Sequence, residues 1–513
     1  MSPRSGHMFK KVKQLHFVGI GGSGMSGIAE ILLNMGYRVT GSDIRRTEVT
    51  ERLERLGAKI YYHHAPENIG DADVVVVSSA IHGDNPELVA AAERGIPVIP
   101  RAEMLAELMR MKYGIGVAGT HGKSTTTSLV GEVLTEGGLD PTVIVGGIVV
   151  NLRSNVRLGT GEYLVAEADE FDKSFLRLSP TIAVVTNMEK EHLECYDDRM
   201  EELRGAFVEF MNKVPFYGAV VLCIDEPPLQ EVLPEIERRV ITYGLSTQAD
   251  VRAVRVEFDE HGSTFTVIAD DKVLGEVRTN LLGLHNVKNT LAAIAVGLEV
   301  GVEFEDIKRA LAKFKGVYRR FQRRGEVSNI MVIDDFAHHP TEIRATLEAA
   351  RTAYPSRRIV AVFQPHLYSR TQEFYQEFGK AFLNSDVLVV TEIYGAREDP
   401  VEGVSGEMIA RAAKDYGHRD VFFEPDTAKL PEFLEKIVHP GDLVMTIGAG
   451  PIWKVGVKFL ERLKEKFEHP ADSEDSPSSE GHPGTGDTVS GEGSVPGTTL
   501  AKPFESQLSQ LRA

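Results

Sequence analysis

The chain has 513 residues, of which 42% are hydrophobic and 26% are charged, and its formal net charge is −18 at pH 7. This composition is typical of a soluble globular protein, and the length predicts about three domains. The acidic balance argues against nucleic acid as a partner, because a surface that binds phosphate backbones is basic.

The chain also lacks the sequence features of a membrane or secreted protein. It has no apolar run long enough to cross a bilayer, so we expect no membrane insertion. Its N-terminal segment has basic residues but not the apolar stretch of a secretory signal. It contains two cysteines, Cys195 and Cys223, which argues against a disulfide framework. The sequence therefore predicts a cytoplasmic protein.

The first unit, up to about Met111, begins with a strand, a glycine-rich loop and a helix. Its predicted elements are strand 14–18, helix 26–35, strand 38–41 and a valine-rich strand 73–78. The loop GIGGSG carries Gly19, Gly21 and Gly24, and Asp43 follows the second strand. This pattern matches the dinucleotide fingerprint, in which a helix N-terminus holds a diphosphate. NAD and a UDP-sugar both contain a diphosphate, so either could bind to such a loop.

A second glycine-rich loop, GTHGKS, lies between a predicted strand over 115–118 and a helix that runs toward Glu136. Lys123 of this loop can reach the outer phosphates of a nucleotide, and Ser124 can place its hydroxyl on a magnesium ion. The strict Walker pattern requires a glycine where this chain has Val117. The prediction of ATP therefore depends on the other motifs.

The middle unit places polar residues after two more predicted strands, 163–166 and 182–186. Glu167 and Asp169 follow the first, and His192 follows the second. Carboxylates at such strand ends commonly hold magnesium, and His192 is either a ligand of a second ion or a surface histidine beside Glu191 and Glu194. The alternating segment 251–277 predicts antiparallel hairpins.

A helix over 286–300 follows these hairpins in the middle unit. Asn286 and Asn289 share one face at its start. Their amides suit adenine recognition, and helix capping is the alternative.

The third unit alternates strands and helices, which predicts a parallel, doubly wound sheet. Asp334 and Asp335 follow strand 330–333 and precede a helix that begins at Pro340, so they could bind ribose hydroxyls or a cation. His366 and Arg370 follow strand 359–363. An arginine there suits a carboxylate or a transferring phosphoryl group, with a surface salt bridge as the alternative.

Taken together, the motifs resemble the Mur ligase family over about residues 12–466. They are GIGGSGMSGIAE, SSAIHGDNPE, GTHGKSTTT, EADEFDKSFL, HNVKNTLAA, RRFQ, DDFAHHPTE and PHLYSRT. The resemblance implies an α/β fold of three domains followed by a disordered acidic tail. These are a Rossmann-like UDP-substrate-binding domain (1–111), a central ATP-binding domain with a P-loop ATPase-like mixed sheet (112–324), a Rossmann-like amino-acid-binding domain (325–467) and the tail (468–513).

The resemblance also implies a reaction. ATP would phosphorylate the lactyl carboxylate of UDP-N-acetylmuramate, and the amine of L-alanine would displace phosphate from the acyl phosphate, with Mg²⁺ as cofactor. Sister ligases use a carbamylated lysine, but this chain has no lysine between Lys190 and Lys213, which fits the alanine-adding branch. Phe336 stands where many relatives have tyrosine. The oligomeric state stays open, a monomer–dimer equilibrium included.

The residue roles that the resemblance implies fall into four groups. ATP would contact Gly119, Thr120, His121, Gly122, Lys123, Ser124, Thr125, Asn286, Asn289, Arg320 and Asp335. The UDP moiety would contact Gly21, Gly22, Ser23, Gly24, Met25, Ser42, Asp43 and Ser79, and the muramyl group would contact Asn155. Magnesium would be held by Ser124, Glu167 and His192. The catalytic residues would be Lys123, His192, His338, His366 and Arg370.

Three alternatives remain at this stage. One is a ligase that recycles a tripeptide onto UDP-N-acetylmuramate, and the second is an NAD-dependent oxidoreductase built on GIGGSG. The third is a nucleotide-gated binding protein without catalysis, which would have no need of four residues together: Lys123, Glu167, His192 and Arg370.

Overall fold

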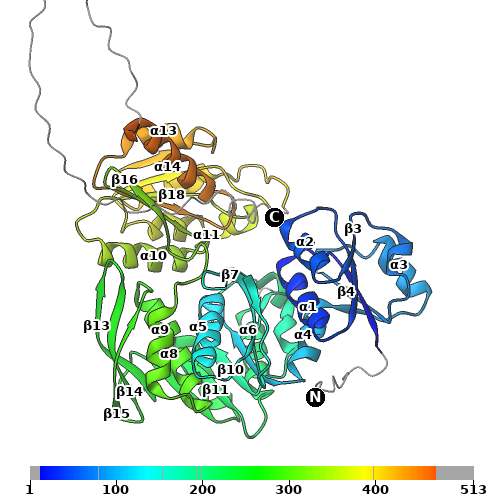
Figure 1. The fold of residues 1–513 in the computed structure, drawn as a ribbon. Helices are drawn as coiled ribbons and strands as arrows, with labels where there is room; N and C mark the ends of the chain where they lie inside the picture. The colour runs from blue at the N-terminus through cyan, green and yellow to red at the C-terminus, as the bar shows by residue number, and fades with distance from the viewer. Residues whose placement is uncertain are drawn as a thin grey trace, which may run out of the picture.

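The fold is described from a computed structural model. It describes residues 12–468 except the single positions 79, 153, 192, 198 and 397. These residues form three β-sheets, each covered by helices (Figure 1). We call the regions around them the N-terminal (β1–β5), central (β6–β15) and C-terminal (β16–β21) domains. The predicted tail, beyond its first residue, lies outside the described residues.

The N-terminal domain has a five-stranded parallel sheet in the order β3-β2-β1-β4-β5. Its strands are β1 (Gln14–Val18), β2 (Arg38–Ser42), β3 (Lys59–Tyr61), β4 (Val74–Val77) and β5 (Val98–Pro100). Its helices are α1 (Ser23–Asn34), α2 (Glu48–Arg55), α3 (Pro86–Glu93) and α4 (Arg101–Met109), with the 3₁₀ turn η1 (Pro66–Ile69). Helix α1 begins three residues earlier than predicted, directly after Gly22, so the loop GIGGSG itself contains the helix start.

The central domain has a ten-stranded sheet in the order β15-β14-β13-β12-β11-β10-β6-β9-β7-β8. Its strands are β6 (Tyr113–Ala118), β7 (Thr142–Val149), β8 (Ser154–Arg157), β9 (Tyr163–Glu167), β10 (Ile182–Val185), β11 (Ala219–Cys223), β12 (Val240–Gly244), β13 (Val251–Asp259), β14 (Gly262–Ala269) and β15 (Lys272–Thr279). Its helices are α5 (Lys123–Glu136), α6 (Met200–Asn212), α7 (Pro227–Val232), α8 (Leu284–Glu299) and α9 (Phe304–Lys313), with the 3₁₀ turns η2 (Phe171–Arg177), η3 (Leu193–Tyr196) and η4 (Leu233–Glu235). The antiparallel hairpins predicted over 251–277 are confirmed as β13–β15.

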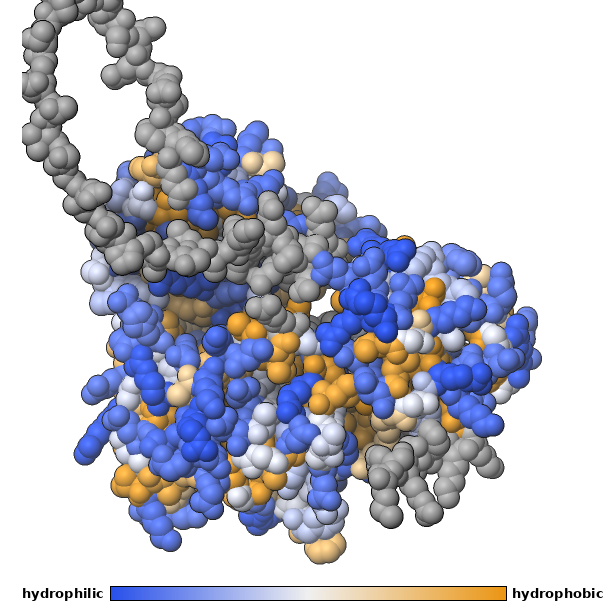
Figure 2. All heavy atoms as spheres, in the orientation of Figure 1, coloured by the Kyte–Doolittle hydropathy of each residue, from blue (hydrophilic) through white to orange (hydrophobic). Residues whose placement is uncertain are grey.

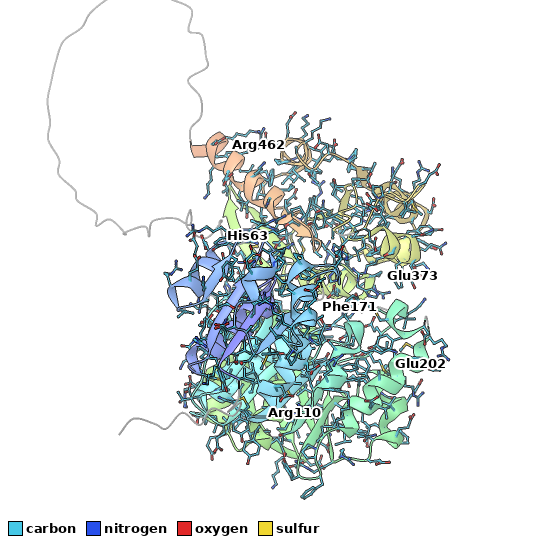
Figure 3. All side chains as sticks on the ribbon, turned by 90° about the vertical axis from the view of Figure 1, so that its right-hand side faces the viewer. His63, Arg110, Phe171, Glu202, Glu373 and Arg462 are labelled. Atoms are coloured by element: carbon cyan, nitrogen blue, oxygen red, sulfur yellow. The ribbon has the colours of Figure 1, made fainter. Side chains whose placement is uncertain are left out.

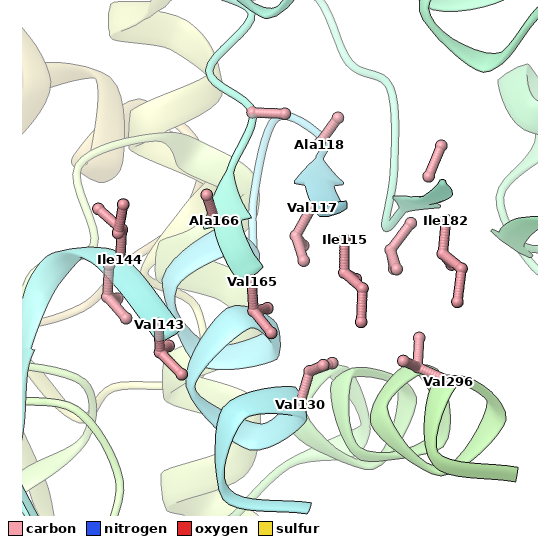
Figure 4. Packing of buried hydrophobic residues seen from close by; sticks show 14 of the residues in the cluster. Ile115, Val117, Ala118, Val130, Val143, Ile144, Val165, Ala166, Ile182 and Val296 are labelled. Atoms are coloured by element: carbon pink, nitrogen blue, oxygen red, sulfur yellow. The ribbon is translucent and has the colours of Figure 1, made fainter. Parts of the chain in front are cut away.

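Aliphatic side chains of two helices, α5 and α8, pack against β6, the strand that leads into the GTHGKS loop. Ile115 and Val117 of β6 are fully buried. In Figure 4, Val130 of α5 and Val296 of α8 point from their helices toward these strands. A strand covered in this way holds its carboxyl end, where the GTHGKS loop begins, in a rigid position.

The C-terminal domain has a six-stranded sheet in the order β16-β17-β21-β18-β19-β20, parallel except for the edge strand β16. Its strands are β16 (Gln322–Val327), β17 (Ile330–Asp335), β18 (Ile359–Phe363), β19 (Val387–Val390), β20 (Val421–Phe423) and β21 (Leu443–Ile447). Its helices are α10 (Pro340–Ala353), α11 (Tyr368–Ala381), α12 (Gly406–Asp415), α13 (Leu430–Ile437) and α14 (Trp453–Glu468). The three-domain α/β architecture predicted from the sequence is confirmed.

The C-terminal domain lies over the central domain, with α10 facing the end of the β13–β14 hairpin (Figure 1). The hydroxyl of Tyr354 donates to the carbonyl of Glu260 in that hairpin, at 3.1 Å. Figure 3, turned by 90°, places Phe171 near the centre of the molecule, at the level where the C-terminal domain meets the rest.

The face of the molecule drawn in Figure 2 is mainly polar. On the face drawn in Figure 2, hydrophilic residues dominate and hydrophobic residues form scattered groups between them. Among the described residues, no helix has both the length and the apolar character needed to cross a membrane.

Candidate active site

The GTHGKS loop adopts a backbone that requires glycine at two positions. Gly119 has φ +133° and Gly122 has φ +84°, in the region that side chains disfavour. A Cβ atom on Gly119 would collide with the hydroxyl of Thr186, and one on Gly122 would lie 2.6 Å from Oδ1 of Asn289. Helix α5 begins at Lys123, so the loop ends at a helix N-terminus, where backbone N–H groups favour an anion.

Lys123 is held by a carboxylate that the sequence analysis did not single out. Its Nζ donates to both carboxylate oxygens of Glu170, at 2.7 and 2.9 Å, and to the carbonyl of Gly119 at 2.7 Å. Burial disfavours the ammonium, but the charges of Glu170 and Asp169 outweigh it and raise the pKa of Lys123. The signal for Glu170 was present, because it lies in the same EADEFD segment as Glu167 and Asp169.

Two of the three predicted magnesium ligands lie together. The carboxylate of Glu167, at the end of β9, accepts from the backbone N–H of Gly146 at 2.7 Å, and the Ser124 hydroxyl acts to lower the pKa of this carboxyl. Burial raises the pKa of Glu167, and the charge of Lys123 offsets this only in part. These hard oxygen donors fit Mg²⁺. The third predicted ligand, His192, lies outside the described residues.

A cavity of about 300 Å³ lies between the central and C-terminal domains and contains most of the predicted ATP contacts. From the central domain it is lined by His121, Gly122, Ser124, Thr125, Asn286 and Asn289, and from the C-terminal domain by Arg320 and Asp335. Thr120 also lies in the loop, and its hydroxyl accepts from the backbone N–H of Glu189 at 2.8 Å. The structure therefore brings the predicted ATP residues of two domains to one cavity.

The side-chain amides of Asn286 and Asn289, predicted to bind adenine, are hydrogen-bonded to each other, and Asn289 is also hydrogen-bonded to α5. Nδ2 of Asn289 donates to Oδ1 of Asn286 at 3.2 Å, and the hydroxyl of Thr126 donates to Oδ1 of Asn289 at 3.2 Å. Nδ2 of Asn286 donates to the carbonyl of Leu282 at 2.8 Å. The alternative of helix capping is wrong, because the N-cap of α8 is Gly283 and no side chain caps it.

The adjacent aspartates of the third unit have different environments. Asp334 is fully buried in ion pairs with Arg319 and Arg324, at 3.0 and 3.2 Å, so it does not face a ligand. Asp335 lines the cavity, and burial raises the pKa of its carboxyl to about 6. The prediction that both aspartates bind ribose or a cation is therefore corrected for Asp334. The neighbouring Arg320 lies 3.4 Å from Glu342.

The predicted catalytic residues of the third unit also converge. Nη1 of Arg370 lies 3.3 Å from Nδ1 of His366, and the rings of His366 and His338 are 5.9 Å apart. Nη2 of Arg370 donates to Glu191 of the central domain at 2.8 Å, with both side chains buried. The alternative of a surface salt bridge for Arg370 is therefore wrong.

The same boundary carries a cluster of histidines and glutamates. Nδ1 of His121 lies 3.3 Å from Glu342, and the hydroxyl of Thr341 donates to Glu189 at 2.7 Å. Burial of His121 disfavours its charged form, but Glu342 and Glu189 outweigh this and raise its pKa to about 10. The sequence analysis named Glu191 only as a neighbour of His192, and it missed Glu189 and Glu342.

A second cavity, of about 280 Å³, lies between the N-terminal and central domains. Gly22, Gly24 and Met25 of the first glycine-rich loop line one side, and Glu167 and Asp169 line the other. Arg101, at the start of α4, also lines it and was missed, although it follows a parallel strand directly. A Cβ atom on Gly24 would lie 2.9 Å from the Arg101 side chain, so this glycine leaves room for the guanidinium.

The carboxylate of Asp43 is hydrogen-bonded to the backbone of this loop. Its Oδ2 accepts from the backbone N–H of Gly21 at 2.9 Å and its Oδ1 from the backbone N–H of Arg45 at 3.1 Å, so both carboxylate oxygens accept hydrogen bonds within the protein. The structure does not bring Ser42 or Asn155 to the cavity. Ser42 is fully buried and donates to Glu87 at 2.5 Å, and Asn155 lines a separate cavity of about 340 Å³ between α1, α2 and the β7–β8 hairpin. Ser79 and the side chain of Ser23 are outside what the structure describes.

Comparisons with known proteins agree with this geometry. The chain matches the family models "Mur ligase family, catalytic domain" over residues 14–113, "Mur ligase middle domain" over 117–297 and "Mur ligase, glutamate ligase domain" over 319–450. It is 55% identical to a UDP-N-acetylmuramate–L-alanine ligase of Geobacter sp. (strain M21), over 89% of this chain and 99% of that one. It is 53% identical to the ligase of the same name from Salinibacter ruber, over 88% and 96%.

Solved structures give the same result. The crystal structure of UDP-N-acetylmuramate–alanine ligase from Thermotoga maritima has a TM-score of 0.73 at 32% identity, covering 88% of this chain and 99% of that one. A murein peptide ligase from Psychrobacter arcticus has a TM-score of 0.64 at 25% identity, covering 88% and 98%. The two glycine-rich loops, the carboxylates after β9 and the three matched domains establish that this chain belongs to the Mur ligase family.

Proposed function

We propose that this chain is an ATP-dependent ligase that joins L-alanine to UDP-N-acetylmuramate in peptidoglycan synthesis. One observation carries this proposal: Glu167 lines the cavity of the first glycine-rich loop, Ser124 lines the nucleotide cavity, and the Ser124 hydroxyl acts to lower the pKa of the Glu167 carboxyl. A carboxylate substrate in the first cavity and the terminal phosphate of ATP in the second would therefore meet beside Lys123. The name shared by the most similar relatives supports the same reaction.

The reaction then has two steps. A carboxylate oxygen of UDP-N-acetylmuramate bonds to the γ-phosphorus of ATP, and the bond to ADP breaks. The amine of L-alanine next attacks the acyl carbon, phosphate leaves, and the amine loses a proton. Lys123 offsets the charge on the transferring phosphoryl group, a task of positioning and electrostatics.

Magnesium belongs to this proposal as the cofactor. Ser124 and Glu167 supply oxygen ligands, and His192 would supply a nitrogen. When bound, the ion neutralises the phosphate oxygens.

The C-terminal domain would supply the amino-acid side of the site. Arg370, His338 and His366 lie together at the boundary with the central domain. A guanidinium suits the carboxylate of an amino acid, which it binds through two parallel hydrogen bonds. We assign L-alanine to this group, ATP to the loop from Gly119 to Thr125 with Asn286, Asn289, Arg320 and Asp335, and the UDP moiety to the loop from Gly21 to Met25 with Arg101.

The proposed domain limits 1–111, 112–324 and 325–467 divide these tasks, except that Arg320 and the start of β16 belong with the C-terminal sheet. A cytoplasmic location fits substrates that require ATP. The matched central and C-terminal domains exclude the NAD-dependent oxidoreductase, which has no use for them. The tripeptide-recycling ligase would join a tripeptide, instead of L-alanine, to UDP-N-acetylmuramate. An experiment with both substrates therefore distinguishes the two ligases.

The test measures phosphate release with ATP, UDP-N-acetylmuramate and either L-alanine or the tripeptide. We expect release that requires both UDP-N-acetylmuramate and L-alanine, and near-total loss in Lys123→Ala. Release with the tripeptide and not with L-alanine would establish the recycling ligase instead. Release that ignores UDP-N-acetylmuramate would contradict the whole proposal.

A further inference from the structure

We propose that His121, Glu189 and His339 form a binding site for a divalent transition-metal ion, of the zinc type, that bridges the central and C-terminal domains. This site is separate from the proposed magnesium ligands, and it does not depend on the proposed ligase activity. His121 belongs to the P-loop, Glu189 follows β10, and His339 is the N-cap residue of α10.

The three side chains are already close enough to share an ion. One ligand atom from each lies within 4.8 Å of the other two. Nε2 of His121 is 3.8 Å from Oε2 of Glu189, and Nδ1 of His339 is 4.0 Å from the same oxygen. Because Nδ1 of His339 accepts from the backbone N–H of Thr341 at 3.4 Å, its Nε2 is the nitrogen left for the ion. A tetrahedral ion with bonds of ~2.0–2.1 Å holds its ligands ~3.3 Å apart, so side-chain shifts of roughly 1 Å complete the site.

Two ring nitrogens in the cluster have no hydrogen-bond partner within the described part of the chain. They are Nε2 of His121 and Nε2 of His339, both inaccessible to solvent. The His339 residue is only 5% exposed. Buried polar atoms in proteins are normally paired, so these orphan nitrogens call for a ligand. An imidazole nitrogen without a hydrogen bond either has a free lone pair, which can bind a metal ion, or carries a proton, which a metal ion can replace.

The neighbours of His121 provide the support that a metal-bound histidine needs. Its other nitrogen, Nδ1, lies 3.3 Å from Glu342 and 3.9 Å from Glu191. A carboxylate on the second nitrogen orients the ring and strengthens the ligand, as in many zinc sites. Glu189 is likewise fixed, because the hydroxyl of Thr341 donates to Oε2 at 2.7 Å. The ring of Phe374 packs edge-on against His339 and adds an apolar wall.

Charge and ligand type together select the ion. Three carboxylates, Glu189, Glu191 and Glu342, lie within 4 Å of His121, so a divalent cation there would be well compensated. Two imidazoles and one carboxylate suit zinc, cobalt or nickel, whereas magnesium prefers oxygen ligands. The cation would take the place of the proton that His121 shares with its carboxylates, so binding releases that proton.

The site lies between the central and C-terminal domains, so a bound ion would affect their separation. Two ligands, His121 and Glu189, come from the central domain and line the nucleotide cavity, and the third, His339, comes from the C-terminal domain. A metal that crosslinks them would resist separation of the two domains. Micromolar zinc, added over excess magnesium, would then slow repeated turnover more than the first turnover.

The test is a titration of the metal-free full-length chain with Co²⁺ in the absence of nucleotide, followed by visible absorption. We expect one equivalent to bind with the strong d–d bands of a four-coordinate ion, and Zn²⁺ to displace it. His339→Asn keeps an N-cap side chain for α10 and removes the imidazole, so it should weaken binding at least tenfold. Glu189→Gln should do the same, and serves as a second variant in case His339→Asn misfolds.

Two further variants decide where the ion sits. His261→Asn removes an exposed histidine of the β13–β14 turn and should leave the titration unchanged. Bands that persist in both His339→Asn and Glu189→Gln but vanish in His192→Asn would place the ion in the proposed magnesium site and overturn the inference. A wild-type titration without d–d bands would overturn it as well.

Discussion

Arg370 of the C-terminal domain and Glu191 of the central domain form a buried ion pair, with Nη2 2.8 Å from Oε1. Their side chains are 8% and 6% exposed, so little water screens the pair. Glu191 directly precedes His192, and Arg370 contacts His366. The pair therefore couples the proposed metal-binding segment to the proposed amino-acid site, and it exists only when the two domains are together.

The first prediction concerns this pair. Arg370→Met and Glu191→Gln should each lower kcat/KM at least a hundredfold, because each leaves a buried group without its partner, a loss of about 3–5 kcal/mol. The kcat/KM of the double variant should be little lower than that of either single variant, since the two side chains act as one unit. Steady-state phosphate release measures this cycle. Fully additive losses would show that the two residues act independently.

The second prediction concerns Glu170, which pairs with Lys123. Glu170→Gln removes a negative charge beside the expected position of the phosphates. ATP binding to the free protein should become about threefold to tenfold tighter, a gain of about 1 kcal/mol. Calorimetric titration with ATP measures it. Weaker binding in this variant would mean that Glu170 helps to hold the nucleotide, for example by orienting Lys123.

The third prediction concerns the left-handed glycines around α5. In Gly122→Ala, the methyl group would meet Oδ1 of Asn289 at 2.6 Å in addition to the strained backbone. ATP affinity should fall at least tenfold, because the loop must move.

Gly138→Ala is the matched control for this variant. Gly138 also has a positive φ, +76°, but a methyl group there meets nothing within 4 Å. We expect it to lower the stability by about 1 kcal/mol without changing ATP affinity. Equal ATP affinity in both variants would contradict the proposed constraint at Gly122.

The fourth prediction concerns Glu87, a buried carboxylate of the N-terminal domain. Burial opposes its charged form, but hydrogen bonds from His16, Ser42 and Asn68 outweigh this and lower its pKa to about 2. Because the folded pKa lies below the usual 4.5, ionised Glu87 stabilises the fold above about pH 4.5. That contribution is lost as the pH falls from about 4.5 toward 2.

Glu87→Gln should therefore lower the free energy of unfolding by about 2 kcal/mol at pH 7, and the difference should shrink below pH 4.5. Urea unfolding across this pH range measures it. Glu93→Gln changes an exposed glutamate at the end of the same helix, α3, and should have no effect. A difference for Glu87→Gln that stays constant down to pH 2 would show that the charge is not its cause.

The sequence by itself determined the architecture and the order of the motifs. Local rules were sufficient: valine-rich strands predict parallel sheets, alternation at 251–277 predicts hairpins, and glycine before Lys123 predicts a phosphate loop at a helix N-terminus. Each of these depends on neighbours along the chain. The predicted residues that lie at strand ends, such as Glu167 and Asp335, accordingly reached cavities.

Only the tertiary structure decided which polar side chains face a ligand and which hold the protein together. Ser42 and Asp334 lie beside Asp43 and Asp335 in the sequence, but side chains alternate along a strand, so neighbours point to opposite faces. Ser42 therefore meets Glu87, and Asp334 meets Arg319. The pairs Arg370–Glu191 and His121–His339 depend on how two domains pack, across more than 170 residues of chain, and no local pattern specifies that distance.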